Sequence, residues 1–174
     1  MKKRRVLRRI SLAFIAIIGL GCLVPNNPTL PVDGASSNDW NEKSFWYSPW
    51  GKSGVHKGID IFGVRGTKIV AASHGVVVYS GRINRGGEVV LILSPKWTLH
   101  YYAHLESRNV EAYAVVSSGE PIGTLGDSGN AKGKQAHLHY SIVSILPRIW
   151  RIDFSEQGWK KMFYLKPQDW WKNE

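Results

Sequence analysis

The chain has 174 residues, of which 43% are hydrophobic and 21% are charged, and its formal net charge is +10. This composition is typical of a globular protein, and the length suits one domain with a hydrophobic core rather than two. Six of the 23 basic residues lie within the first nine positions, and without them 17 basic residues stand against 13 acidic ones, a net charge of +4. The positive charge therefore gives little support to a nucleic-acid-binding protein, and we expect no nucleic-acid partner.

An apolar run over residues 10–24 follows these cations and ends before Pro25. A basic head before a short apolar core is the layout of an export signal, which favours it over a buried core helix. The run has about 15 residues, between a signal-peptide core and the roughly 20 that span a bilayer comfortably. Residues 1–24 are therefore predicted to be a cleaved signal peptide or a retained membrane anchor. The positive end stays in the cytoplasm, so we expect the remainder to be exported.

The single cysteine closes this apolar run in the order Gly19-Leu20-Gly21-Cys22. The order resembles the lipobox of bacterial lipoproteins, with Gly where Leu is usual, so Cys22 is a candidate for lipid attachment and an unmodified thiol is the alternative. The segment or its lipid would make the membrane a partner. One cysteine also excludes an intramolecular disulfide, so burial or a metal has to stabilise the exported domain.

Short β-rich runs follow a segment, residues 25–41, that is rich in Pro, Asn, Ser, Asp and Gly and is predicted to be a flexible linker. The runs are Lys68–Ala72, Gly75–Tyr79, Glu88–Leu93, Thr98–His104, Ala114–Val116 and His137–Ile145. No apolar stretch of helical period lies between residues 51 and 144. We therefore expect a mainly β domain over residues 42–146, a small antiparallel sandwich or barrel, rather than alternating strands and helices.

The remaining residues, 147–174, differ in character because four tryptophans stand among Arg and Lys. They are Trp150, Trp159, Trp170 and Trp171. We expect a short helix and an extended end, with the aromatic rings packed on the sheet, since Trp is generally well buried. The alternative is an aromatic binding site.

Four of the six histidines fall, together with one aspartate, in three short motifs. These are His56-Lys57-Gly58-Ile59-Asp60, Tyr102-Ala103-His104-Leu105 and His137-Leu138-His139. Glycines around the first motif favour an extended or looped segment over a helix. In a strand, His137 and His139 share one face and Leu138 points into the core.

The same alternation applies to the run 98–104. It predicts His100, Tyr102 and His104 on one face of the strand, and Leu99, Tyr101 and Ala103 on the other. Two neighbouring strands would then direct several histidines to one place. The two histidines outside the motifs are less informative: His74, before a glycine, is expected in a turn, and His100 either is exposed or supports the site from behind.

Zinc suits this group of side chains, because it accepts imidazole nitrogen and carboxylate oxygen in tetrahedral geometry. Two histidines and one aspartate would leave the fourth position open for water, as in catalytic sites. Such a metal lowers the pKa of its water and polarises a carbonyl group. The other histidines of the motifs can then serve as a base or as hydrogen-bond donors to the transition state.

Taken together, the motifs resemble the lysostaphin-type zinc peptidases of bacterial cell walls, whose domain is a small antiparallel β fold called the duplicated hybrid motif. The resemblance extends over about residues 50–144, in the segments 54–61, 66–72, 75–79, 102–105, 123–126 and 137–140. It implies that His56, Asp60 and His139 are the ligands of one zinc ion. It also implies that His104 and His137 line the cleft and assist the attacking water or the tetrahedral intermediate.

All five positions are present, whereas non-catalytic relatives that activate other wall hydrolases typically lack some of them. Two departures concern substrate preference. His74 stands where the family often has Asp or Asn, and Lys132 and Lys134 replace small residues and Pro in the loop 127–135. These lysines either form a solvated loop or attract an anionic wall peptide.

We therefore expect an exported zinc metalloendopeptidase of the bacterial cell envelope, periplasmic or membrane-anchored, that hydrolyses a peptide bond in peptidoglycan, with a cross-link as the expected bond. The alternative is a non-catalytic peptidoglycan-binding or regulatory module that controls other wall hydrolases.

Overall fold

A computed structural model describes residues 2–25 and 27–171, and over these residues nine strands form one antiparallel sheet. The strands are β1 (Ile59–Phe62), β2 (Lys68–Val70), β3 (Gly75–Ile83), β4 (Gly87–Leu93), β5 (Thr98–Arg108), β6 (Val115–Val116), β7 (Pro121–Leu125), β8 (His137–Ser144) and β9 (Tyr164–Leu165). The two α-helices are α1 (Lys2–Leu23) and α2 (Gln168–Trp171). The mainly β, antiparallel prediction is confirmed.

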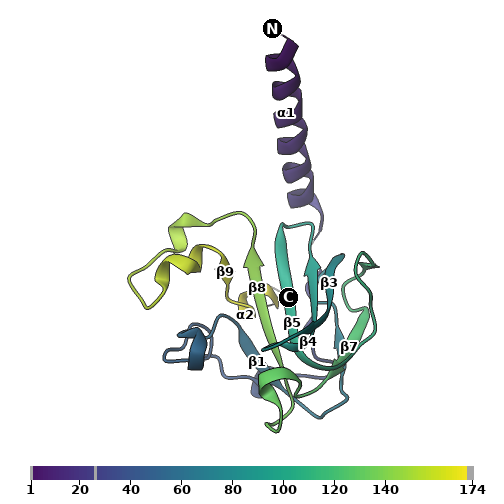
Figure 1. Ribbon diagram of the computed structural model, residues 1–174, viewed down its shortest axis with the longest axis vertical. Helices are drawn as coiled ribbons and strands as arrows, with labels where there is room; N and C mark the ends of the chain where they lie inside the picture. Colours follow the sequence, from purple (N-terminus) through teal and green to yellow (C-terminus); the bar gives the residue numbers. More distant parts are fainter. Residues whose placement is uncertain (1, 26, 172–174) are drawn as a thin grey trace.

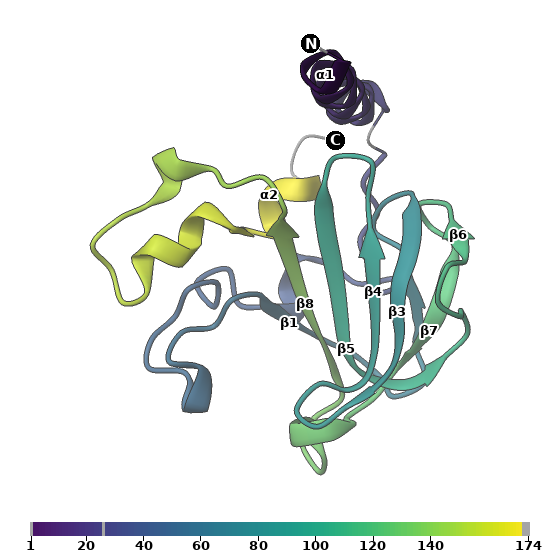
Figure 2. The same ribbon diagram turned by 45° about the horizontal axis from the view of Figure 1, so that its top comes forward.

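The strands follow the order β1-β8-β5-β4-β3-β6, while β7 pairs with both β2 and β5, and β9 pairs with β8. β5 joins the two parts of the sheet, because its first residues lie between β4 and β8 and its last residues pair with β7. The sheet curls without closing into a barrel, as Figures 1 and 2 show.

The hydrophobic core fills the concave side of this curled sheet. Alternate residues of β8 supply part of it, since Leu138, Tyr140 and Ile142 are fully buried. Ile69 of β2 and Ile122 of β7 join the same cluster from the other part of the sheet. Burial of each such side chain contributes about 1.5–3 kcal/mol to the free energy of folding. Burial therefore determines which face of β8 packs on the core, and the opposite face remains available for a site.

All six predicted strands exist, with ends that differ by a few residues, but β1, β7 and β9 were not predicted. β1 has only four residues and lies among glycines, so its sequence alone gives a weak strand signal. β7 contains Gly123, whose α-carbon lies against the backbone carbonyl of Ser107 in β5, where a side chain would not fit. The close approach of two strands therefore requires a glycine at this position.

Helix α1 projects from the sheet (Figures 1 and 2) and contacts the β4–β5 turn at Trp97, whose indole Nε1–H donates to the Ile18 carbonyl over 3.2 Å. Among the described residues, no helix combines the length and the apolar character needed to cross a membrane. Cys22 belongs to α1 by its backbone, but its side chain lies outside the described part of the structure. The signal-peptide and lipid-attachment predictions therefore remain predictions.

Part of the segment predicted as a flexible linker packs along β2. The amide of Val70 donates to the carbonyl of Pro31 over 2.9 Å, and the amide of Asp33 donates to Lys68 over 3.0 Å. Val32 is 3% exposed and belongs to the core. These apolar and backbone contacts anchor residues 29–33, so a free tether over the whole of 25–41 does not describe this structure.

The C-terminal residues form two short 3-10 helices, η4 (Ile149–Arg151) and η5 (Gly158–Met162), followed by β9 and α2. The predicted packing of the tryptophans is correct for Trp170 and Trp171, which pack against the core. It is wrong for Trp150 and Trp159, which are 77% and 55% exposed, because they lie on an arm that extends away from the sheet (Figure 1). Residues 172–174 lie outside the described residues.

Candidate metal centre and cleft

The site is built on the convex face of the sheet, where β1, β8 and β5 place three residues in one row. Asp60 of β1 is the register partner of His139 of β8, and His139 is the partner of Ala103 of β5. Their neighbours Ile59, Ile61 and Leu138 are fully buried in the core. Strand alternation then directs the Asp60 and His139 side chains to the opposite face.

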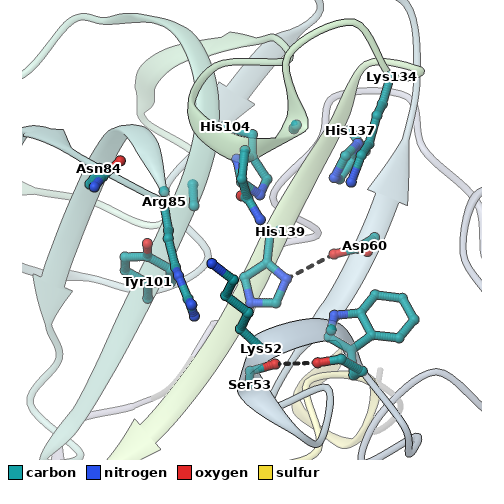
Figure 3. A pocket seen from close by; sticks show the side chains of 16 residues that line it. Lys52, Ser53, Asp60, Asn84, Arg85, Tyr101, His104, Lys134, His137 and His139 are labelled. Carbon is teal, nitrogen blue, oxygen red and sulfur yellow. Dashed lines mark hydrogen bonds and ion pairs between the residues drawn. The ribbon is translucent and has the colours of Figure 1, made fainter.

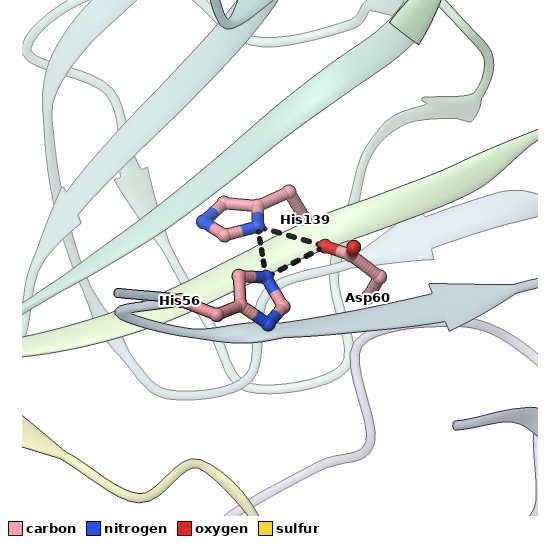
Figure 4. A group of neighbouring side chains, drawn as sticks. All are labelled: His56, Asp60 and His139. Atoms are coloured by element: carbon pink, nitrogen blue, oxygen red, sulfur yellow. Dashed lines mark hydrogen bonds and ion pairs between the residues drawn. The ribbon is translucent and has the colours of Figure 1, made fainter. Parts of the chain in front are cut away.

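His56 completes a group of three side chains that Figure 4 shows converging. Its Nε2 lies 3.1 Å from Asp60 Oδ1 and 3.1 Å from His139 Nδ1. The third distance, from His139 Nδ1 to Asp60 Oδ1, is 2.8 Å. These are the residues that the family resemblance implies as metal ligands, and the fold brings all three together.

The group His56, Asp60 and His139 is called the triad below. Contacts with residues outside the triad hold His56 in a defined orientation. Its Nδ1–H donates to the carbonyl of Ser44 over 3.0 Å, which leaves the lone pair of Nε2 facing Asp60 and His139. The Trp50 indole stacks on the imidazole at 4.1 Å between ring centroids. His56 is 1% exposed, so it is fixed by its surroundings before any ligand binds.

The donor atoms fit a small divalent cation. A neutral His56 presents a lone pair toward the carboxylate of Asp60, and electron-rich atoms converge in this way around metals. Burial alone would raise the pKa of Asp60, but the adjoining imidazoles of His139 and His56 hold this pKa well below its usual value, so the carboxylate is ionised. Ligand atoms about 2.0–2.1 Å from a tetrahedral zinc lie roughly 3.3 Å apart, close to the distances between the three side chains.

His104 reaches the same face by a break in the strand. Its φ is 66°, and the register of β5 shifts against β4 between Tyr102 and Leu105. The predicted alternation is correct for His100 and Tyr102, which face the core, but wrong for His104, which lines the cleft beside Tyr101 and Ala103. A β-bulge adds one residue to the strand and turns the following side chain to the other face.

His104 and His137 form a second group, a histidine pair beside the triad, with ring centroids 5.1 Å apart. The Nδ1–H of His104 donates to the carbonyl of Ser128 over 2.8 Å, and that of His137 donates to Gln135 over 2.7 Å. In each neutral ring the lone pair is therefore on Nε2. Burial lowers the pKa of His104 to about 4, although the bond to Ser128 opposes this shift.

A cavity of about 670 Å³ connects these groups (Figure 3). Asp60, His104, His137 and His139 all line it. A smaller cavity of about 440 Å³ adjoins it and includes His56, and His139 lines both. The triad thus lies at the junction of two hollows on the convex face, with His104 and His137 on the wall of the larger one.

Comparisons with known proteins agree with this geometry. The family model described as Peptidase family M23 matches residues 54–147, which include all five of these residues. The chain belongs to peptidase family M23. The match begins two residues before His56 and contains β1 through β8, so the family domain is the curled sheet that carries the cleft.

Two curated relatives and one solved structure illustrate the similarity. The L-Ala–D-Glu endopeptidase of Bacillus subtilis is 33% identical over 140 residues, 74% of this chain and 43% of the relative. The murein hydrolase activator NlpD of Escherichia coli is 37% identical over 90 residues, 51% of this chain and 23% of the relative. The chain thus spans less than half the length of either relative. The catalytic domain of lysostaphin from Staphylococcus simulans superposes with a TM-score of 0.59 at 26% identity, covering 78% of this chain and 96% of that domain.

His100 and His74 lie outside the cleft of this M23 domain. His100 is fully buried on the core side, where Thr98 and the hydroxyl of Tyr140 bond its ring, and burial lowers its pKa to about 3. The expectation of an exposed His100 is therefore wrong, and support of the site from behind, through Tyr140 next to His139, stays a prediction. His74 lies at a bend before β3, as expected, and its Nδ1 accepts from the amide of Ser118 over 3.2 Å.

Among the cleft residues that sequence reasoning did not identify, four have aromatic or charged side chains. These are Trp50, Lys52, Arg85 and Tyr101. The alternation of β5 was a signal for Tyr101, since it predicts that residue on the face of Ala103. Arg85 had a weaker signal, a cation in the turn between two predicted strands. The two loop lysines are both exposed, but Lys134 lines the cavity and Lys132 does not.

Proposed function

We propose that this M23 chain is a zinc-dependent endopeptidase that hydrolyses peptide bonds in the peptidoglycan of the bacterial cell envelope, cross-links among them. The observation that carries the proposal is the convergence of five side chains on one face of the sheet: His56, Asp60, His139, His104 and His137. The triad supplies ligands for one metal ion, and the histidine pair supplies two oriented imidazoles beside it.

His56, Asp60 and His139 would hold the zinc, with Ser44 and Trp50 fixing the orientation of His56. A zinc ion bound there would supply Lewis-acid chemistry: it would lower the pKa of water and polarise the carbonyl of the scissile bond. The carboxylate of Asp60 also offsets part of the ion's charge. These three residues accept no proton in the reaction; their role is to position the ion at the border of the two cavities.

His104 and His137 would carry the proton transfers. Because each Nδ1–H is held by a backbone carbonyl, each neutral Nε2 can take a proton from the attacking water. The imidazolium that results can donate a hydrogen bond to the developing oxyanion or return the proton to the departing amine. Two such groups on one wall allow one to act as the base and the other to stabilise charge.

The names of two relatives support the proposed substrate class and location. The Bacillus subtilis relative is named for cleavage of the bond between L-Ala and D-Glu, and the Escherichia coli relative is named for activation of murein hydrolases. Both names refer to the cell wall, which lies outside the cytoplasm. This supports the export that the cationic and apolar N-terminus predicts, and residues 1–24 would then be a signal or an anchor with Cys22 as a lipid attachment site.

Turnover of defined muropeptides tests the proposal. The zinc-loaded chain is incubated with cross-linked muropeptide dimers, and the products are identified by mass. We expect cleavage that a chelator abolishes and added zinc restores. Dimers that remain intact in the presence of stoichiometric bound zinc would contradict the proposal. The product masses also distinguish a cross-link bond from an L-Ala–D-Glu bond.

A regulatory module is the second candidate, because the Escherichia coli relative is named a murein hydrolase activator. The two functions differ in their need for His137. If the chain only regulates, a His137→Ala variant complements a deletion strain as well as the wild type does. If the chain hydrolyses peptidoglycan, this variant fails to complement although it is present at the normal level.

A further inference from the structure

The larger cavity carries an excess of positive charge. Lys52, Arg85 and Lys134 line it, and Asp60 is the one acidic residue among the described residues that do so. The carboxylate of Asp60 is already bonded by His56 and His139. Three cations thus face a cavity in which the described residues supply no free carboxylate, and this arrangement attracts anions.

Arg85 differs from the other arginines of residues 54–147, because it has no acidic partner among the described residues. Arg65 pairs with Glu106 at 2.5 Å, and Arg82 and Arg108 both pair with Glu88, at 3.0 and 2.7 Å. Within residues 2–25 and 27–171, no carboxylate pairs with the Arg85 guanidinium. Nearby acidic groups are therefore already paired with other arginines, and Arg85 retains its full capacity for an external anion.

The backbone that carries Arg85 is nevertheless held in place. The carbonyl of Arg85 accepts from the amide of Asn130 over 3.0 Å, and the carbonyl of Gly86 accepts from the amide of His104 over 2.7 Å. On the other side, the hydroxyl of Ser128 accepts from the amide of Glu88 over 2.9 Å. The β3–β4 turn is thus fixed against β5 and the 3-10 helix η3 (Gly129–Ala131), so the free guanidinium starts from a defined point on the cavity wall.

Lys52 has a similar setting on the opposite loop, the 3-10 helix η2 (Gly51–Ser53). The carbonyl of Ser53 accepts from Lys57 Nζ over 3.0 Å and from Gln157 Nε2 over 2.9 Å, which ties this loop to the C-terminal arm. Lys57 is thereby occupied, whereas Lys52 points into the cavity (Figure 3).

The three cations are distributed around the catalytic residues rather than gathered at one point. In Figure 3, Arg85 and Lys52 lie on the side of His139 near Tyr101, and Lys134 lies beside His137 on the other side. A peptide bond placed at His139 would therefore have cations along the chain in both directions.

We infer that this cavity is a binding site for an acidic peptide whose free carboxylates flank the scissile bond, with Arg85 and Lys52 binding a carboxylate on one side and Lys134 binding one on the other. The inference deepens the proposed function, since it specifies which wall peptides the same site selects: those with free rather than amidated carboxyl groups. The planar guanidinium of Arg85 can bind a carboxylate through two parallel hydrogen bonds, whereas each lysine acts as a point charge.

Equilibrium binding to the metal-free chain tests this inference separately from catalysis. A bound metal would itself attract carboxylates, and turnover would consume the ligand, so both are removed with a chelator. The two ligands are muropeptide dimers with free carboxyl groups and the same dimers after conversion of these groups to amides. Calorimetry gives a dissociation constant for each, and the ratio of the two constants measures selection by charge.

We expect the free-acid dimer to bind about tenfold more tightly at low salt, the product of two exposed carboxylate contacts worth about threefold each. Added salt should reduce this ratio. Arg85→Gln and Lys134→Gln should each reduce it by about threefold, because each weakens binding of the free-acid dimer more than binding of the amidated one, and circular dichroism shows whether the variants are folded. Lys132→Gln, a lysine of the same loop that does not line the cavity, is the matched control and should keep the wild-type ratio.

Equal dissociation constants for the two dimers would overturn the inference, and so would a ratio that survives both substitutions or no measurable binding of either dimer. None of these results bears on the proposed function, because that function is read from turnover by the zinc-loaded chain. Conversely, a chain that selects the free acid but cleaves nothing would retain this inference and lose the proposed peptidase activity.

Discussion

Asp60 and His139 face each other at one register position of the β1–β8 pair, with 2.8 Å between Oδ1 and Nδ1. Two strands of the sheet therefore set this distance, and only His56 joins from outside a strand. Sites on regular elements hold their geometry better than sites on loops. The pairing of a four-residue strand with β8 thus has a functional consequence, because a shift by one residue would turn Asp60 into the core.

Removal of the Asp60 carboxylate should lower the affinity of the chain for zinc. Substitution of a residue that only hydrogen-bonds to a metal ligand lowers metal affinity by roughly 10- to 100-fold. Asp60 is itself a proposed ligand, so we expect Asp60→Asn to lower zinc affinity by at least about 100-fold. The affinity is measured by competition with a chelator, and elemental analysis gives the zinc content. His74→Ala is the control, because His74 bonds Ser118 outside the cleft. Undiminished zinc in Asp60→Asn or His56→Ala protein would contradict the ligand assignment.

Substitution of the histidine pair should separate catalysis from metal binding. His104 and His137 line the cavity but do not belong to the convergent triad. We expect His104→Gln and His137→Gln to bind zinc as the wild type does and to lose about 10²- to 10⁴-fold in kcat, the usual contribution of a positioned acid or base. Full turnover in either variant, or a loss of zinc equal to that of Asp60→Asn, would show that the roles are assigned wrongly.

The sequence predicts most of the sheet because its signals are local. Alternation along β8 placed His137 and His139 on one face and Leu138 in the core, as the structure shows. The same argument failed at His104, because a bulge depends on how β5 pairs with two different neighbours. Arg85 and Lys52 meet in one cavity only after the sheet has curled, and no local pattern contains that information.

The buried imidazole of His100 should make the fold sensitive to mild acid. Burial lowers the pKa of His100 to about 3, from an ordinary value of 6.5, so the unfolded chain takes up a proton first as the pH falls. Stability is then lost progressively below pH 6.5, at up to about 1.4 kcal/mol per pH unit from this group. His104 acts in the same direction. The pKa of Asp60 is lowered from 3.8, so the stability that its carboxylate contributes is lost only below about pH 3.8. A measurement from pH 7 to 4.5 therefore does not include this loss.

Denaturant unfolding of the metal-free chain across this pH range measures the effect. We expect the wild type to lose about 2 kcal/mol or more between pH 6.5 and 4.5, in line with the linkage relation. A His100→Gln variant should show a distinctly smaller slope, whatever its absolute stability. An unchanged slope in the variant would mean that another group is responsible.

The contact between the β3–β4 turn and η3 should be sensitive to a single methyl group. Gly129 has a φ of 69°, and a Cβ there would overlap backbone atoms of Arg85 and Gly87. Gly133 has a φ of 79° in the same loop, but nothing lies within 4 Å of its Cβ position. Gly133→Ala should therefore cost about 1–2 kcal/mol from backbone strain alone, and Gly129→Ala about 1–3 kcal/mol more from the overlap.

The two glycine variants should also differ in function. The overlap at Gly129 displaces the turn that carries Arg85 and disturbs Ser128, whose carbonyl orients His104. We therefore expect Gly129→Ala to lower kcat and to weaken selection of the free-acid dimer, measured at a temperature where the variant is folded, while Gly133→Ala keeps both near the wild-type values. Equal stability and equal turnover in the two variants would show that the turn and η3 do not need this close approach, and that His104 and Arg85 are positioned by β5 and β3 alone.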